Sequence, residues 1–126
     1  MSGFRQPGKQ RELLVVTATT ITLTAHDAGK VISNVGAAGN LAITFPAAST
    51  CQPGDQIMVL SCAAGTITCS FTAGELITLN DVSANSVALS TSSEIIGGGF
   101  LFTCVSGSKW HCSIMCEETQ TVTVAT

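Results

Sequence analysis

Short runs of β-branched and other apolar residues, separated by Gly, Pro, Asn and Asp, recur along most of this 126-residue chain. Such runs are typical of β-strands, and their spacing of about eight to twelve residues is typical of a sandwich or barrel. No window of useful length shows the apolar period of a helix. We therefore predict an all-β fold, an antiparallel, jelly-roll-like sandwich or barrel. The predicted strands cover residues 13–17, 20–24, 30–34, 41–45, 56–62, 66–71, 87–90, 99–105, 110–115 and 119–124.

The first twelve residues lack this pattern and contain three of the five cations, Arg5, Lys9 and Arg11. We expect residues 1–12 to form an extended basic arm and residues 13–126 to form a single β domain. Six of the eight acidic residues lie at or beyond Asp55, so the body is mildly acidic. Two interpretations of the arm stay open: a solvated tail, or a segment that becomes ordered against an acidic partner.

Charged residues make up only 10% of the chain and apolar residues 45%, whereas about a quarter of an average globular domain is charged. Ser, Thr, Asn and Gly must therefore cover much of the surface, which favours packing against other subunits. The small net charge of −3 argues against a nucleic-acid or membrane-surface partner. The first ten residues have no apolar signal segment, and the longest apolar runs are far shorter than the ~20 residues of a membrane span. We expect synthesis in a cytosol.

The six cysteines are interpreted as free core thiols, because disulfides are rare in a reducing cytosol. Two predicted hairpins account for four of them, one over residues 56–71 turning at Ala64-Gly65 and one over residues 100–116 turning at 106–108. Their registers would place Met58, Leu60 and Cys62 opposite Phe71, Cys69 and Ile67, and Phe100, Phe102 and Cys104 opposite Ile114, Cys112 and Trp110. All four thiols would then lie in the core.

Zinc binding is the sharper alternative for His111, Cys112 and Cys116. On one strand, however, Cys112 and Cys116 would lie roughly 13 Å apart, and His111 would point to the opposite face. We expect no metal and no other cofactor.

No catalytic motif accompanies this β pattern. A nucleophile elbow and a phosphate-binding glycine loop are both absent, and the adjacent pair His26-Asp27 falls in a predicted turn. Glu117 and Glu118 would point to opposite faces of a strand. Trp110, the only tryptophan, alternates with Cys112 and Ile114 and is predicted to be in the core, which argues against an aromatic carbohydrate platform. We expect no enzymatic activity.

The order of motifs resembles a small β-domain found in virion proteins of tailed bacteriophages. The matching elements are Thr24-Ala25, Ala28-Gly29-Lys30, a strand that ends at Asn34, the sequence Phe45-Pro46-Ala47-Ala48, a strand after Gly54, the segment AGELITLN, and Gly107 to Trp110. The family usually has Leu where this chain has Phe45, and its members do not typically carry six cysteines. Most of residues 17–115 is covered.

The resemblance implies a structural virion protein, many of which are trimers. The leading hypothesis is an outer-capsid decoration (cement) protein, made in the host cytoplasm, that binds the major capsid protein between subunits as a homotrimer. The expected contact residues are Arg5, Lys9 and Arg11 in the arm and Thr119, Thr121 and Thr123 in the uncharged last strand, which as an unpaired edge would aggregate. The alternative hypothesis is a head- or tail-fibre module that binds a receptor on the host surface.

Overall fold

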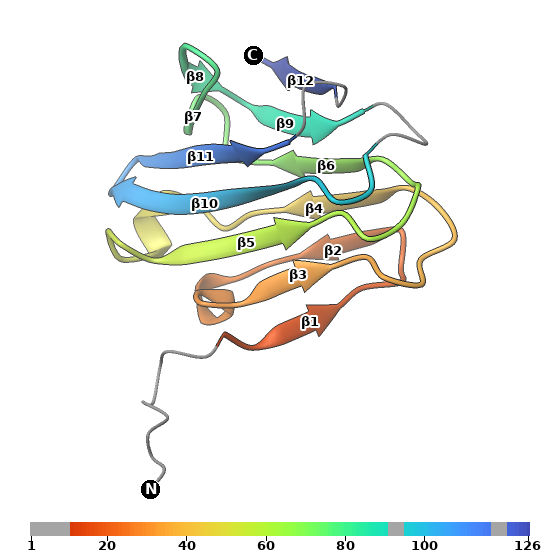
Figure 1. Ribbon diagram of the computed structural model, residues 1–126. Helices are drawn as coiled ribbons and strands as arrows, with labels where there is room; N and C mark the ends of the chain where they lie inside the picture. The colour runs from red at the N-terminus through yellow and green to blue at the C-terminus, as the bar shows by residue number, and fades with distance from the viewer. Residues whose placement is uncertain (1–10, 91–94, 117–120) are drawn as a thin grey trace, which may run out of the picture.

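Consecutive strands in the first half of the chain cross from one sheet to the other instead of turning back beside each other. The computed structural model describes residues 11–90, 95–116 and 121–126, and two sheets pack face to face in it (Figure 1). The first six strands are β1 (Leu13–Val15), β2 (Thr20–Thr22), β3 (Val31–Ser33), β4 (Leu41–Thr44), β5 (Gln56–Leu60) and β6 (Ile67–Ser70). Short 3-10 helices, η1 (Ala25–Asp27) and η2 (Ala48–Thr50), lie between them.

Each sheet therefore gains a new strand only after a full coil of the chain. In one sheet β1 pairs with β3 and β3 with β5, and in the other β2 pairs with β4 and β4 with β6; all four pairs are parallel. The first half is thus a coil of two strands per turn, and each strand returns to its sheet in the same direction.

The second half completes both sheets, partly through antiparallel pairs. Its strands are β7 (Leu76–Thr78), β8 (Asp81–Ala84), β9 (Ser86–Leu89), β10 (Gly99–Ser106), β11 (Lys109–Met115) and β12 (Val122–Ala125). The order is β1-β3-β5-β10-β11-β7-β8 in the seven-stranded sheet and β12-β9-β6-β4-β2 in the five-stranded sheet. Strand β10 runs antiparallel to β5, and β9 runs antiparallel to β6.

The predicted all-β sandwich is confirmed, with a strand at all ten predicted positions. In the part of the chain that the structure describes, the sheets stay separate and do not close into a barrel. The antiparallel, jelly-roll-like pairing was wrong in detail, because both sheets are mixed. The parallel pairs of the first half arise because each of β1 to β5 is followed by a strand in the opposite sheet, a choice that local alternation does not encode.

The predicted hairpin over residues 56–71 is also wrong, because β5 and β6 belong to different sheets. Ile57 and Val59 point into the core, so Met58 and Leu60 face outward and Cys62 is exposed. Residues 57–60 are all apolar, and such a run does not show which of its two faces is buried.

The predicted β10–β11 hairpin is confirmed in its register. Phe100 lies opposite Ile114, Phe102 opposite Cys112 and Cys104 opposite Trp110, and the register shifts between Cys104 and Ser106. Here apolar and polar residues alternate on β11, so one face is unambiguous.

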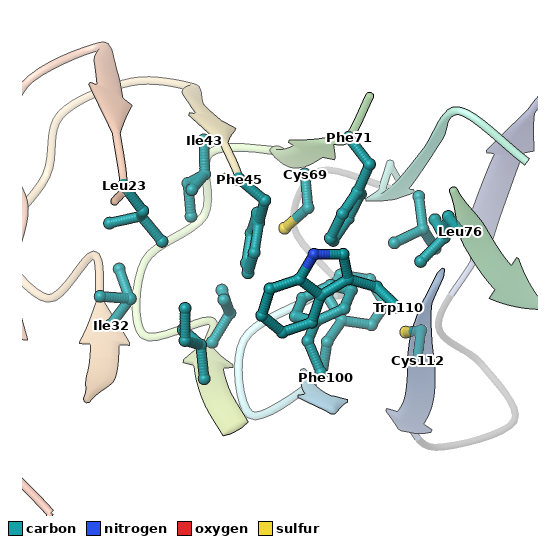
Figure 2. Packing of buried hydrophobic residues seen from close by; sticks show 14 of the residues in the cluster. Leu23, Ile32, Ile43, Phe45, Cys69, Phe71, Leu76, Phe100, Trp110 and Cys112 are labelled. Carbon is teal, nitrogen blue, oxygen red and sulfur yellow. The ribbon is translucent and has the colours of Figure 1, made fainter. Parts of the chain in front are cut away.

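Aromatic rings from both sheets meet in the centre of the core (Figure 2). Phe45 follows β4 and stacks on Phe71, which follows β6, at 4.4 Å between ring centroids. Phe102 on β10 and Trp110 on β11 lie 4.6 and 5.9 Å from Phe45. The Trp110 Nε1–H donates a hydrogen bond of 3.1 Å to the Pro46 carbonyl, so the predicted core position of Trp110 is confirmed.

Asparagine side chains join successive turns of the coil. The Asn34 Oδ1 accepts a hydrogen bond from the Cys62 N–H (2.6 Å), and the Asn40 Oδ1 accepts one from the Thr66 N–H (2.9 Å). Between these two contacts the loops touch at Gly39 and Gly65, where a Cβ on Gly65 would overlap the Gly39 carbonyl. Only glycine permits this approach.

Replacing Gly65 with alanine should therefore destabilise the coil. We expect Gly65→Ala to lower the free energy of unfolding by about 1–3 kcal/mol, because the new methyl group must push two backbones apart. The measurement is denaturant unfolding followed by far-UV circular dichroism. Gly107→Ala is the matched control, since a Cβ there has open space around it. Equal stability of the two variants would contradict the close approach.

Candidate interaction surfaces

The predicted contact residues of the N-terminal arm are only partly described. Arg5 and Lys9 lie outside the described residues, whereas Arg11 is exposed and its Nη2 donates a hydrogen bond of 2.9 Å to the Gln56 Oε1. The Glu12 carbonyl accepts a hydrogen bond from the Val31 N–H (2.8 Å). Residues 11 and 12 are thus bound to the body of the domain.

Strand β12, which contains Thr123, lies at the opposite edge of the molecule from β1 (Figure 1). Thr119 is outside the described residues. Thr121 and Thr123 are exposed, and the Thr123 Oγ1 lies 2.7 Å from the Ser90 Oγ. Strand β12 pairs with β9 on one side, and no strand in the described part of the chain pairs with its other side. The described residues of the two predicted contact regions therefore lie apart, beside β1 in one sheet and on β12 in the other.

The outer face of the five-stranded sheet carries only small, uncharged side chains. The strand registers align them in two rows, Thr20–Ala42–Thr68–Ala88–Thr123 and Thr22–Thr44–Ser70–Ser86–Ala125. All ten are at least partly exposed. We call this surface the threonine face. It includes Thr123, so one predicted contact residue belongs to a much larger surface.

Part of the outer face of the seven-stranded sheet is apolar, and no described part of the chain covers it. One row of aligned residues runs Leu13–Val31–Met58–Leu101–Ser113, and the next runs Val15–Ser33–Leu60–Gly99–Met115. We call the seven Leu, Val and Met residues of these two rows the apolar face. Leu13, Val15 and Met115 are 58%, 46% and 37% exposed, and the other four are partly exposed.

Side chains from β5 and β11 meet over the strand between them, β10. Gly99 on β10 has no side chain, and the outward position beside it is filled by the neighbours. The Leu60 Cδ2 and the Met115 Cε would lie 3.2 and 3.3 Å from a Cβ placed on Gly99. Leu60 and Met115 therefore converge over β10 and join β5 to β11.

Sequence reasoning missed the apolar face, although a signal for it was present. Residues 13–16, 57–60 and 100–102 are unbroken apolar runs, whereas the strands of the other sheet alternate, as in TITLT at 20–24. Alternation is typical of a sheet with one solvated face, and continuous runs are typical of a sheet covered on both faces.

Four of the six thiols are buried, and all six are free. Burial raises the pKa of Cys112 to about 12 and the pKa of Cys69 well above its usual range. Burial also raises the pKa of Cys51 and Cys104. A thiol must lose its proton to act as a nucleophile or a metal ligand. The core position predicted for Cys69, Cys104 and Cys112 is confirmed, and that of Cys62 is wrong.

Among the other titratable groups, Asp27 stabilises the short helix η1 through hydrogen bonds to its carboxylate. Its Oδ2 accepts a hydrogen bond from the Thr24 N–H (2.8 Å) and its Oδ1 one from the Lys30 Nζ (2.7 Å). Despite partial burial, which opposes the shift, these bonds lower its pKa. Asp27 thus holds η1 in place. His26-Asp27 and Gly29, whose φ is +90°, form the turn predicted there.

No group of three or more His, Cys, Asp or Glu side chains in the described residues is placed to hold a metal ion. No helix in the same part of the chain has the length and apolar character needed to cross a bilayer.

No protein-family model matches this chain, and no curated protein matches it either. The resemblance to phage β-domains therefore stays a prediction from the residues quoted above.

Thiol labelling should divide the cysteines by position. At pH 8 without reductant, an alkylating reagent should modify the exposed Cys62 promptly and Cys69, Cys104 and Cys112 only as fast as the fold opens, because their thiols are buried and protonated. Peptide mapping by mass spectrometry identifies the sites. Denatured protein should label at all six positions, and Cys62→Ser should remove the fast site. Prompt modification of native Cys69 or Cys112 would contradict the described core.

Proposed function

We propose that this protein is a structural component of a tailed-phage virion that decorates the outer capsid and binds between capsid subunits. The observation that carries the proposal is the threonine face, which spans all five strands of its sheet without a charged residue. The order of motifs that resembles phage virion domains supplies the biological setting. The proposed partner is the major capsid protein.

A surface of Thr, Ser and Ala is suited to binding another protein laterally. Its short side chains lose little conformational entropy when they are covered, and their hydroxyl groups both donate and accept hydrogen bonds. Covering this face removes no charged group from water, so the desolvation cost of buried charges does not arise. Strand β12 extends this face to an open edge, where a capsid strand can add main-chain hydrogen bonds.

In this proposal the protein stabilises the shell by mass action. A ligand that binds the assembled capsid and not its free subunits shifts the equilibrium toward the assembled state. The threonine face supplies the main contact, and Arg5 and Lys9 supply additional contacts to an acidic surface of a neighbouring subunit. This role requires a rigid domain, and the aromatic core holds the two sheets together rigidly.

A fibre module is the second candidate, and the open end of the coil favours it. At β1 and β2 each sheet ends in a strand that no other described strand pairs on its outer side. Further coils of a shaft could add there in the same parallel manner. The two candidates differ in copy number: a decoration protein should approach the copy number of the major capsid protein, and a fibre should be far below it. Quantitative gels of purified particles separate them.

Binding to particles that have been stripped of the protein tests the decoration role. Ala88→Lys, in the middle of the threonine face, should lower occupancy by roughly 30-fold or more at a fixed protein concentration, because a charge then has to be buried at the contact. Ser108→Lys, in the β10–β11 turn, is the matched control and should bind like the original protein. Equal occupancy of the two variants would overturn the proposed contact surface.

Deleting residues 1–10 tests the arm in the same assay. The deletion should stop at residue 10, because Arg11 and Glu12 bind Gln56 and Val31 in the domain. Reduced occupancy at low ionic strength, with the difference shrinking in high salt, is expected if Arg5 and Lys9 meet an acidic surface. Undiminished occupancy would remove the arm from the mechanism.

A further inference from the structure

We infer that the apolar face of the seven-stranded sheet is the surface through which this protein associates with further copies of itself, sheet against sheet. The inference concerns a different face from the one proposed to bind the capsid and does not rest on that proposal.

The apolar face is too continuous for a surface that stays in water. Single exposed apolar side chains are common in folded proteins and need no explanation. Here seven of them lie in two adjacent rows across β1, β3, β5, β10 and β11, and two of the seven converge over Gly99. Contiguous apolar patches of this kind mark interaction sites.

The size of this sheet is sufficient for a specific protein contact. With strands ~4.8 Å apart and ~3.3 Å of rise per residue, seven strands of three to eight residues present an outer face of roughly 500 Å². Two such faces cover roughly 1,000 Å² in total, which is about the lower limit for a specific interface. The apolar face extends from the edge strand β1 to β11, and the polar residues Gln56, Thr103, His111 and Ser113, which also point outward, border it on one side. Polar residues beside an apolar patch are common at interfaces.

Several observations identify the occupant as another copy of this chain. Neither row of the apolar face contains a charged residue, so two identical faces can meet without repulsion between like charges. Flat sheet faces pack on each other at a separation of about 10 Å. Met58 and Met115 are flexible enough to fill the gaps between two such faces. A copy is also present from the moment of synthesis, when an uncovered apolar face would otherwise cause aggregation.

Copies that turn this face toward a common axis bury it on one another, whether two pack directly or three surround a threefold axis. Either arrangement leaves the threonine face, on the opposite side of the sandwich, free for another partner. Self-association and capsid binding can therefore occur together.

Analytical ultracentrifugation of the full chain in reductant tests this inference. The original protein should sediment as a dimer or trimer at micromolar concentration. Leu101→Lys, in the middle of the apolar face, should raise the dissociation constant by roughly 30-fold or more. Thr68→Lys is the matched control, since it lies on a central strand of the other sheet and is also partly exposed. It should leave the oligomer intact.

A second variant separates loss of association from loss of the fold. Val15→Lys lies on the edge strand β1, 46% exposed, and cannot disturb the core. It should also weaken association, while circular dichroism and the emission of buried Trp110 stay native in both variants. A protein that is monomeric up to roughly 100 μM, or Leu101→Lys and Val15→Lys variants that associate as tightly as the original, would overturn the inference. Failure of capsid binding alone would leave it unaffected.

Discussion

The contact of Trp110 with Phe45 and Pro46 joins the two sheets at the centre of the molecule. The indole ring meets the Phe45 ring at 5.9 Å and donates a hydrogen bond to the Pro46 carbonyl at 3.1 Å. Phe71 and Phe102 complete the cluster, so residues that are far apart in the chain are held by one set of rings (Figure 2). Such ring pairs contribute about 0.5–1.5 kcal/mol each beyond the burial of their area. Two of the motifs behind the phage resemblance, Phe45-Pro46 and the final tryptophan, are thus partners in space.

This contact in the core determines which residues of each strand face outward. Because the large side chains of both sheets point toward the aromatic cluster, the outward residues of each strand are free to serve another purpose. In the five-stranded sheet they are Thr, Ser and Ala, and in the seven-stranded sheet they are the Leu, Val and Met residues of the apolar face beside polar residues such as Gln56 and His111. The two surfaces proposed to bind partners are therefore faces of different character on one core.

The sequence predicted strands and turns correctly where the pattern of apolar residues allowed only one face of a strand to be buried. Alternation on β11 was sufficient to predict its register with β10 residue by residue. The turn at Gln52–Asp55 also follows from its sequence, because Pro-Gly favours a type II turn. Gly54 has a φ of +99°, and the Asp55 N–H donates a hydrogen bond to the Gln52 carbonyl. By contrast, β7 and β8 were missed. Their two-residue turn uses Leu79 and Asn80 at φ of +44° and +67°, and leucine is not a residue that predicts such a turn.

The local sequence pattern does not show to which sheet a strand belongs. Nothing in residues 56–71 distinguishes a hairpin from a crossover to the opposite sheet, and that choice decided the burial of Cys62. The apolar face was missed for the same reason, since a strand with apolar residues on both sides can present either one to the core. Of the predicted contact residues, Thr123 lies within a face that pairing between distant strands creates, and this pairing follows from topology.

Self-association requires that the apolar face is covered in the native protein. Hydroxyl-radical footprinting of the full chain over a range of concentrations tests it directly, since methionines report their own exposure through oxidation. Met58 and Met115 should become protected as concentration rises, while Leu79, 58% exposed in the β7–β8 turn, should be oxidised at a constant rate. Unchanged oxidation of Met58 and Met115 at every concentration would contradict the account.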